Sequence, residues 1–146
     1  MKKVILGFTL IELIVVIGII GTLATIVVVR FSGPREEAQN SQRRSDLKQY
    51  QTAIEVYANR NNGLFPDSGG ITVNLTSLCV PLALGTCPDD PVVGNYKYSA
   101  NAGRSAYVLW AQLAKTDTFF ALCSTGAVGE MPSTWTGPSG AGVCPL

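Results

Sequence analysis

The sequence of 146 residues contains no histidine, the residue that most often serves as a general base and as a metal ligand. Serine and cysteine nucleophiles therefore have no imidazole to activate them. No two cysteines stand at the CxxC spacing of a zinc site, and no phosphate-binding GxxxxGKS/T loop occurs. These absences argue against an enzyme and favour a structural or binding protein.

Charged residues are also scarce, at 14% of the chain against roughly 25% for a typical soluble domain. The net charge is +1, so the bulk electrostatics predict no nucleic-acid partner. The deficit lies mainly in the first thirty positions, where Glu12 is the only ionisable side chain between Val4 and Val29. The remaining chain has the length and composition of one compact domain.

Residues 8–29 form one long apolar run. As a helix these residues would measure about 33 Å, which is enough to cross the hydrocarbon core of a membrane. The apolar core of an ordinary signal peptide has about 7–15 residues, and no A-x-A-like cleavage site ends this run. Because Lys2 and Lys3 precede it, we predict a single-pass helix in the cytoplasmic membrane with its N-terminus in the cytoplasm.

Glu12 lies inside this run, where inserting a carboxylate costs up to about 3 kcal/mol on insertion scales, and such a group is expected to have a partner and a function. Cleavage after Gly7 would provide a partner, because the free α-amine of Phe8 would stand four residues before Glu12. Two unit charges near 4 Å are worth about 4 kcal/mol at an effective dielectric of about 20. That magnitude fits a pair within one chain as well as a pair between two chains.

The N-terminal pattern of a basic leader, Gly7, the residues FTLIE at positions 8–12 and an apolar run resembles the signal of type IV pilins and type II secretion pseudopilins. The resemblance implies that a prepilin peptidase cleaves between Gly7 and Phe8 and that Phe8 is N-methylated. It also implies that an inner-membrane assembly platform builds the subunits into a helical homo-oligomeric filament. In that filament Glu12 would pair with the Phe8 amine of a neighbouring subunit.

A second stretch, YANRNNGLFP at residues 57–66, is similar to the helix-to-loop junction of major pseudopilins. The leading hypothesis is a structural subunit of a type IV pilus-like extracellular filament, for which adhesion, motility and binding to DNA or surfaces are open. The alternative is a pseudopilin of a type II secretion or DNA-uptake machine, with a periplasmic filament. A distant alternative is a secreted binding domain or enzyme with an unusual signal peptide.

The resemblance and the residue pattern together predict an α+β, pilin-like fold, in which a long N-terminal helix packs on a small antiparallel sheet. Residues 1–7 would be a leader peptide and residues 8–30 the transmembrane and filament-core helix. Residues 31–62 would continue the helix after a kink at Gly33-Pro34, because proline disfavours helical geometry in the residue before it. Residues 63–146 would form the sheet and loop region.

An apolar stripe at spacings of three and four residues predicts the face with which the second helix packs on the sheet. Its members are Leu47, Tyr50, Ile54 and Tyr57. The charged residues expected to lie largely off that stripe are Arg43, Arg44, Asp46, Lys48 and Glu55.

The rest of the chain predicts short strands. Residues 95–99 and 106–110 indicate a hairpin around a turn at residues 101–103, and residues 118–123 indicate a third strand. Residues 71–75 are predicted to be a strand or a loop. The tail from Gly126 to Leu146 is expected to be irregular, and Trp110 and Trp135 are expected to be packing residues.

The four cysteines all follow the apolar run, and an even number in an exported domain predicts two disulfides. Four cysteines allow three pairings. We favour Cys79–Cys87 with Cys123–Cys144, because each pair closes a local loop that contains glycine or proline.

The sequence predicts no cofactor and only a weak calcium candidate. Asp89 and Asp90 lie between two prolines and are expected to form a solvated turn. With Asp117 they could offer carboxylate oxygens to calcium, but that ion takes six to eight ligands and the spacing matches no specific pattern.

Overall fold

The computed structural model describes residues 8–28, 32–92, 94, 96–114 and 117–146. The chain forms two compact units, Met1–Arg35 and Glu36–Leu146, and each is described here by itself. The predicted leader, residues 1–7 with Gly7, lies outside the described residues. The fold is α+β, with helices in the first part of the chain and strands in the second.

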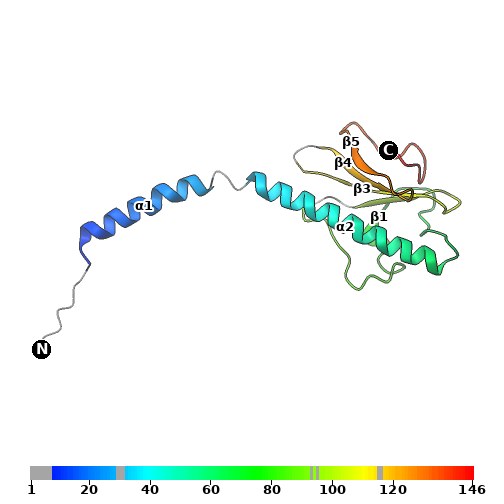
Figure 1. The fold of residues 1–146 in the computed structure, drawn as a ribbon, viewed down its shortest axis with the longest axis horizontal. Coiled ribbons are helices and arrows are strands. Elements are labelled where there is room, and N and C mark those ends of the chain that lie inside the picture. Colours follow the sequence, from blue (N-terminus) through cyan, green and yellow to red (C-terminus); the bar gives the residue numbers. More distant parts are fainter. Residues whose placement is uncertain (1–7, 29–31, 93, 95, 115–116) are drawn as a thin grey trace, which may run out of the picture. The chain divides into compact units, whose positions relative to one another are not determined.

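The first unit contains helix α1, Leu10–Val28 (Figure 1). Its large apolar side chains from Phe8 to Leu23 are 45–84% exposed. A helix that is apolar on all sides needs other apolar groups to cover it. Even so, no described helix combines the length and the apolar character needed to cross a membrane, so these residues do not support the span predicted over residues 8–30.

Helix α2 runs over Ser32–Arg60. Gly33 and Pro34 lie inside its first turn. Proline is tolerated there because the first amides of a helix have no acceptor within the helix, and glycine lacks the Cβ that would clash with the following proline ring. The chain between α1 and α2, residues 29–31, lies outside the described residues, so the kink predicted between the two helices stays a prediction.

The second unit contains a sheet with the strand order β1-β2-β3-β4-β5, in which all neighbours are antiparallel. The strands are β1 Val73–Asn74, β2 Lys97–Ala100, β3 Tyr107–Gln112, β4 Phe119–Cys123 and β5 Val128–Met131. The predicted hairpin is confirmed by β2 and β3, and the predicted third strand by β4, although Asn95 lies outside the described residues. The ambiguous stretch at residues 71–75 is the short β1, followed by a 3-10 helix at Leu75–Leu78.

Strand β5 was not predicted, because the tail was expected to be irregular. It contains glycine and glutamate, which are poor strand formers, so its pairing with β4 rather than its own propensity makes it a strand. Gly126 has a φ of 86° in the turn between them, a conformation that favours glycine. The Gly126 amide donates to the Cys123 carbonyl at 3.0 Å, and the Cys123 amide donates to the Ala127 carbonyl at 2.9 Å.

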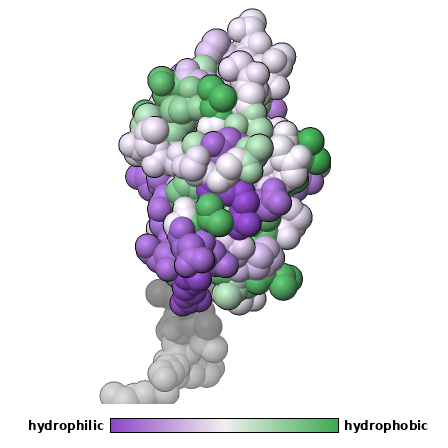
Figure 2. All heavy atoms as spheres, turned by 90° about the vertical axis from the view of Figure 1, so that its right-hand side faces the viewer, coloured by the Kyte–Doolittle hydropathy of each residue, from purple (hydrophilic) through white to green (hydrophobic). Residues whose placement is uncertain are grey.

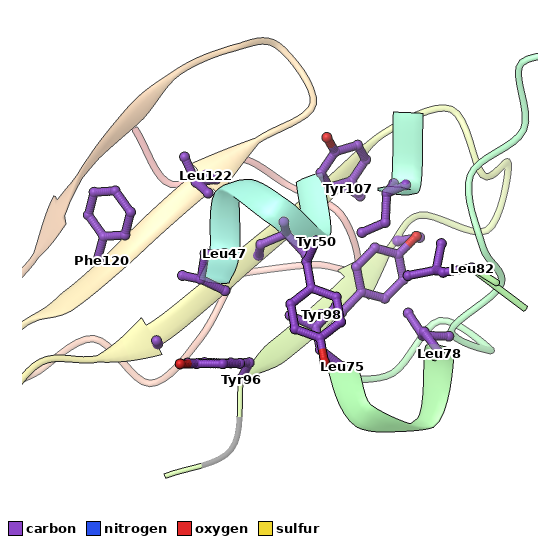
Figure 3. Close-up of a cluster of buried hydrophobic side chains, with 14 of the residues drawn as sticks. Leu47, Tyr50, Leu75, Leu78, Leu82, Tyr96, Tyr98, Tyr107, Phe120 and Leu122 are labelled. Atoms are coloured by element: carbon purple, nitrogen blue, oxygen red, sulfur yellow. The ribbon is translucent and has the colours of Figure 1, made fainter. Parts of the chain in front are cut away.

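The apolar residues of the second unit gather in two clusters, one on each face of the sheet. Its surface in Figure 2 mixes hydrophilic and hydrophobic residues. The helix-side cluster lies between α2 and the sheet. Its α2 members Leu47, Tyr50 and Ile54 are fully buried, which confirms the predicted stripe, and Tyr57 packs partly buried beside them. The main residues that the sheet and its loops add, many of them visible in Figure 3, are Leu75, Tyr96, Tyr98, Tyr107, Leu109 and Leu122.

The outer cluster lies on the opposite face, because alternate residues of β3 point to opposite sides of the sheet. Its buried members are Val108, Trp110, Ala121 and Cys123. Trp135 packs edge-to-face on Trp110 and on Phe119, with ring centroids 5.5 Å apart in both pairs. The prediction that Trp110 and Trp135 are packing residues is confirmed.

Candidate assembly site

Glu12 lies in the first turn of α1 and forms a capping box with Thr9. The amide and the hydroxyl of Thr9 donate to Glu12 Oε2 at 3.0 and 2.8 Å, and the Glu12 amide donates to Thr9 Oγ1 at 3.3 Å. This reciprocal arrangement satisfies two amides that a helix start otherwise leaves without acceptors. The carboxylate therefore points back toward the start of the helix, the direction in which the Phe8 amine was expected.

Thr9 was missed in the sequence analysis. The T-x-x-E spacing ahead of an apolar run is the signature of a capping box and was present in the sequence. Only one carboxylate oxygen of Glu12 is used by Thr9. The other, Oε1, has no hydrogen bond to another described residue, so it can accept from a donor on a second molecule.

The surroundings of Glu12 are apolar. Phe8, Ile11, Val15 and Val16 line a surface hollow of about 320 Å³ with Glu12. Farther along α1, the hydroxyls of Thr22 and Thr25 donate to carbonyls three residues earlier, at 2.9 and 2.8 Å. These bonds satisfy the threonine hydroxyls within the helix, so the described surface of α1 offers apolar contact along its length and a carboxylate at its start.

A buried ion pair in the second unit corrects two predictions. Arg43 was expected off the packing stripe and Asp90 in a solvated turn, yet their side chains are only 5% and 3% exposed. Arg43 Nε and one terminal nitrogen donate to the two oxygens of Asp90 at 2.9 and 2.8 Å. The two parallel hydrogen bonds offset the free-energy cost of removing both charges from water. The pair also holds the loop after Cys87 against α2.

Asn40 extends this contact to the turn between β3 and β4. Its side-chain amide donates to the Ala114 carbonyl at 3.2 Å, and its carbonyl oxygen accepts from the Ala114 amide at 2.8 Å and from Arg43 at 3.1 Å. One stretch of α2 thus holds two loops that are far apart in the sequence.

This geometry bears on the calcium candidate. Both oxygens of Asp90 are already engaged by Arg43. Asp89 and Asp117 are exposed, and one Asp89 oxygen accepts the Asp90 amide at 2.9 Å. Among the residues that the structure describes, no group of three or more histidine, cysteine, aspartate or glutamate side chains could hold a metal ion.

Two carboxylates of α2 accept hydrogen bonds from buried tyrosines, one just before β2 and one in β3. Tyr96 donates to Asp46 and Tyr107 donates to Glu55, both at 2.7 Å. Burial, followed by these carboxylates, raises the pKa of both phenols above the ordinary value. Burial likewise raises the pKa of Tyr50 to about 12. Asp46 and Glu55, which lie beside the stripe, therefore satisfy the hydroxyl groups of two tyrosines in the core.

Residues 57–66 end α2 and connect it by hydrogen bonds to β2 and to the turn between β2 and β3. Asn62 and Gly63 have φ values of 58° and 78°, and the Gly63 amide donates to the Ala58 carbonyl at 2.8 Å, as in a helix C-cap. The Phe65 carbonyl accepts from Arg104 Nε at 2.6 Å, and the Pro66 carbonyl accepts from the Tyr98 hydroxyl at 2.7 Å.

The structure joins the cysteines in the pairing favoured from the sequence. Cys79 is bonded to Cys87 and Cys123 to Cys144, with Cα atoms 5.9 and 5.6 Å apart. The first bond closes the loop after the 3-10 helix. The second ties the C-terminal tail to β4.

No protein-family model and no solved structure matches the chain. The chain is similar to the type II secretion system core protein G of Klebsiella michiganensis, with 30% identity over 100 residues, which cover 62% of this chain and 70% of the relative. The same protein of Vibrio cholerae is 32% identical over 92 residues, 62% of this chain and 56% of the relative.

The core protein G of Pectobacterium carotovorum is 41% identical, but over 56 residues that cover 38% of this chain and only 36% of the relative. The exposed apolar helix with its capped Glu12 and the α+β globular unit agree with these similarities. The chain therefore belongs to the family of the type II secretion system core protein G, a pseudopilin family.

Proposed function

We propose that this chain is a structural subunit that polymerises through α1 into the filament of a type II secretion system. The observation that carries the proposal is the similarity to core protein G in a chain whose α1 exposes an apolar surface with one carboxylate. Packing α1 against helices of other subunits would keep this apolar surface covered as it leaves the lipid, so assembly need not expose it to water.

The comparisons favour the alternative from the sequence analysis over its leading hypothesis. The relatives are named for type II secretion, whereas the leading hypothesis was a type IV pilus-like extracellular filament. A filament of a secretion machine is therefore the better proposal. Motility, adhesion and DNA uptake find no support in these relatives' names.

Processing would create the assembly site. A prepilin peptidase would cut between Gly7 and Phe8, and N-methylation would leave the Phe8 amine a cation. Before assembly the apolar helix would anchor the precursor in the cytoplasmic membrane, and afterwards it would lie in the core of a periplasmic filament. An inner-membrane assembly platform would transfer the subunit between the two.

The capping box suggests how Glu12 serves its own chain and a neighbour at once. Thr9 occupies Oε2, and Oε1 would accept a charge-assisted hydrogen bond from the Phe8 amine of a neighbouring subunit. Such a bond forms only when the amine arrives at the depth of Glu12. In this arrangement apolar packing keeps α1 covered and Glu12 sets the axial register.

Deletion of the chain in its native cell tests the proposal. We expect exported proteins that depend on type II secretion to accumulate in the periplasm, and plasmid-borne wild-type chain to restore their release. Normal secretion together with loss of surface filaments would contradict the proposal and favour the pilus.

A further inference from the structure

The C-terminal tail, residues 132–146, covers the outer cluster of the sheet. Trp135 from the tail packs between Trp110 of β3 and Phe119 of β4, and Cys144 packs against the same cluster. Figure 1 shows the tail returning over β5 and the neighbouring strands. The outer face of the sheet thus depends on a segment without regular secondary structure for its cover.

Side-chain and backbone packing position the tail. Gly142 is buried with a φ of 68°, and a Cβ there would lie 2.4 Å from the Ala106 carbonyl oxygen and the Asn101 nitrogen. Leu146 packs against Gly129 of β5, where an added Cβ would lie 2.8 Å from the leucine Cδ2. The tail follows the turn between β2 and β3 closely at one point and β5 at another.

The tail's hydrogen bonds, by contrast, are local. The Trp135 amide donates to the Pro132 carbonyl at 2.9 Å, and the Val143 amide donates to the Gly140 carbonyl at 3.0 Å. Both bonds would persist if the segment moved away from the sheet. Apart from the chain itself, which leaves β5 at Met131, the covalent link between the tail and the sheet is the bond between Cys123 and Cys144.

We propose that the tail is an oxidation-dependent cover, which closes over the outer cluster only when Cys123 and Cys144 are joined. Closure transfers two electrons and two protons from these thiols to a disulfide-bearing oxidant, which leaves as two thiols; a reducing dithiol reverses the step. In a reducing compartment the tail would be open, and export into an oxidising one would close it. This inference goes beyond the proposed function and does not depend on how α1 assembles.

The two faces of the sheet carry separate spectroscopic reporters. Both tryptophans of the chain, Trp110 and Trp135, belong to the outer cluster. All five tyrosines belong to the helix-side cluster or pack against it. Tryptophan emission therefore reports on the tail, and the near-ultraviolet circular dichroism of the tyrosines reports on the packing of α2.

Acrylamide quenching of tryptophan emission tests the proposal on the full chain in detergent, before and after a reducing dithiol. We expect reduction to raise the quenching constant at least twofold. Because the dithiol also reduces Cys79–Cys87, which lies beside the tyrosines, the tyrosine signal is compared instead between the wild-type chain and the unreduced Cys123→Ser, Cys144→Ser chain, and it should be the same in both. Cys123→Ser with Cys144→Ser should show the high constant without reduction. The matched control, Cys79→Ser with Cys87→Ser, should show the low constant and still respond to the dithiol.

Two outcomes would overturn the proposal. Unchanged quenching after reduction and in the Cys123→Ser, Cys144→Ser chain would mean that packing alone holds the tail. Loss of the tyrosine signal in the unreduced Cys123→Ser, Cys144→Ser chain, which keeps Cys79–Cys87, would mean that the Cys123–Cys144 bond supports the whole globular unit rather than a cover on one face.

Discussion

The two helices of this chain differ in the exposure of their apolar side chains. Along α1 the large apolar side chains from Phe8 to Leu23 are 45–84% exposed, whereas Leu47, Tyr50 and Ile54 of α2 are fully buried. The second unit completes its own core with a sheet, an ion pair and two disulfides. The second unit is therefore built to be stable by itself, whereas the proposed function covers α1 with lipid before assembly and with other subunits after it.

The same division applies to the polar groups. In α1 a single carboxylate is capped by its own helix through one oxygen. In the second unit every buried side-chain nitrogen and oxygen that the structure describes has a hydrogen-bond partner. Substitutions in the second unit should therefore change stability, and substitutions at Glu12 should change assembly.

The largest effect on stability is expected from breaking the buried ion pair. Arg43→Ala leaves Asp90 buried without its cation, which costs about 3–5 kcal/mol in comparable cases. Chemical denaturation of the full chain in detergent measures the loss.

Arg44→Ala is the matched control for that substitution. Arg44 pairs with Glu130 at the surface, where such a pair is worth about 0–1 kcal/mol. Equal losses for the two variants would show that the Arg43–Asp90 pair contributes little more than a surface contact.

High pH should weaken the second unit next. A phenol whose pKa is raised by folding contributes stability that is complete below its unfolded pKa, about 10, and that is lost as pH rises through the folded pKa. Tyr50, with a folded pKa of about 12, places this loss between pH 10 and 12, and the raised pKa values of Tyr96 and Tyr107 act in the same direction.

Unfolding midpoints measured across this pH range test the alkaline loss. Tyr96→Phe and Tyr107→Phe should each make the decline shallower, since a buried phenylalanine has no proton to lose. A wild-type midpoint that stays constant up to pH 12 would refute the explanation.

The smallest effect is expected at the start of α1. Thr9→Val removes the hydroxyl of the capping box and should destabilise the helix start by about 1 kcal/mol, whereas Thr9→Ser keeps the hydroxyl and should not. Amide hydrogen exchange of residues 10–13 in detergent micelles measures this change, and it should be faster in Thr9→Val than in Thr9→Ser. Equal exchange in the two variants would show that Thr9 does not cap the helix.

Local patterns in the sequence predicted much of this structure. The stripe from Leu47 to Ile54, the β2–β3 hairpin and strand β4 all follow from periodicity and turn residues that act over a few positions. The favoured cysteine pairs are also close in sequence, with separations of 8 and 21 residues.

The features that could not be predicted depend on contacts between residues far apart in the sequence. Arg43 and Asp90 are 47 residues apart, and nothing near either residue indicates that the loop folds back onto α2. Strand β5 owes its conformation to β4 rather than to its own residues. Thr9 is the exception, because its capping-box spacing with Glu12 was legible in the sequence.

Quantitative cross-linking of filaments assembled by Glu12→Gln measures the central claim most directly. Glutamine keeps an oxygen that can cap Thr9 but removes the charge, and the exposed Glu37→Gln serves as the control. We expect the Glu12→Gln chain to be inserted and processed at wild-type levels but to yield less than a tenth of the cross-linked multimers, with Glu37→Gln unaffected. Wild-type multimer yield from Glu12→Gln would contradict the account.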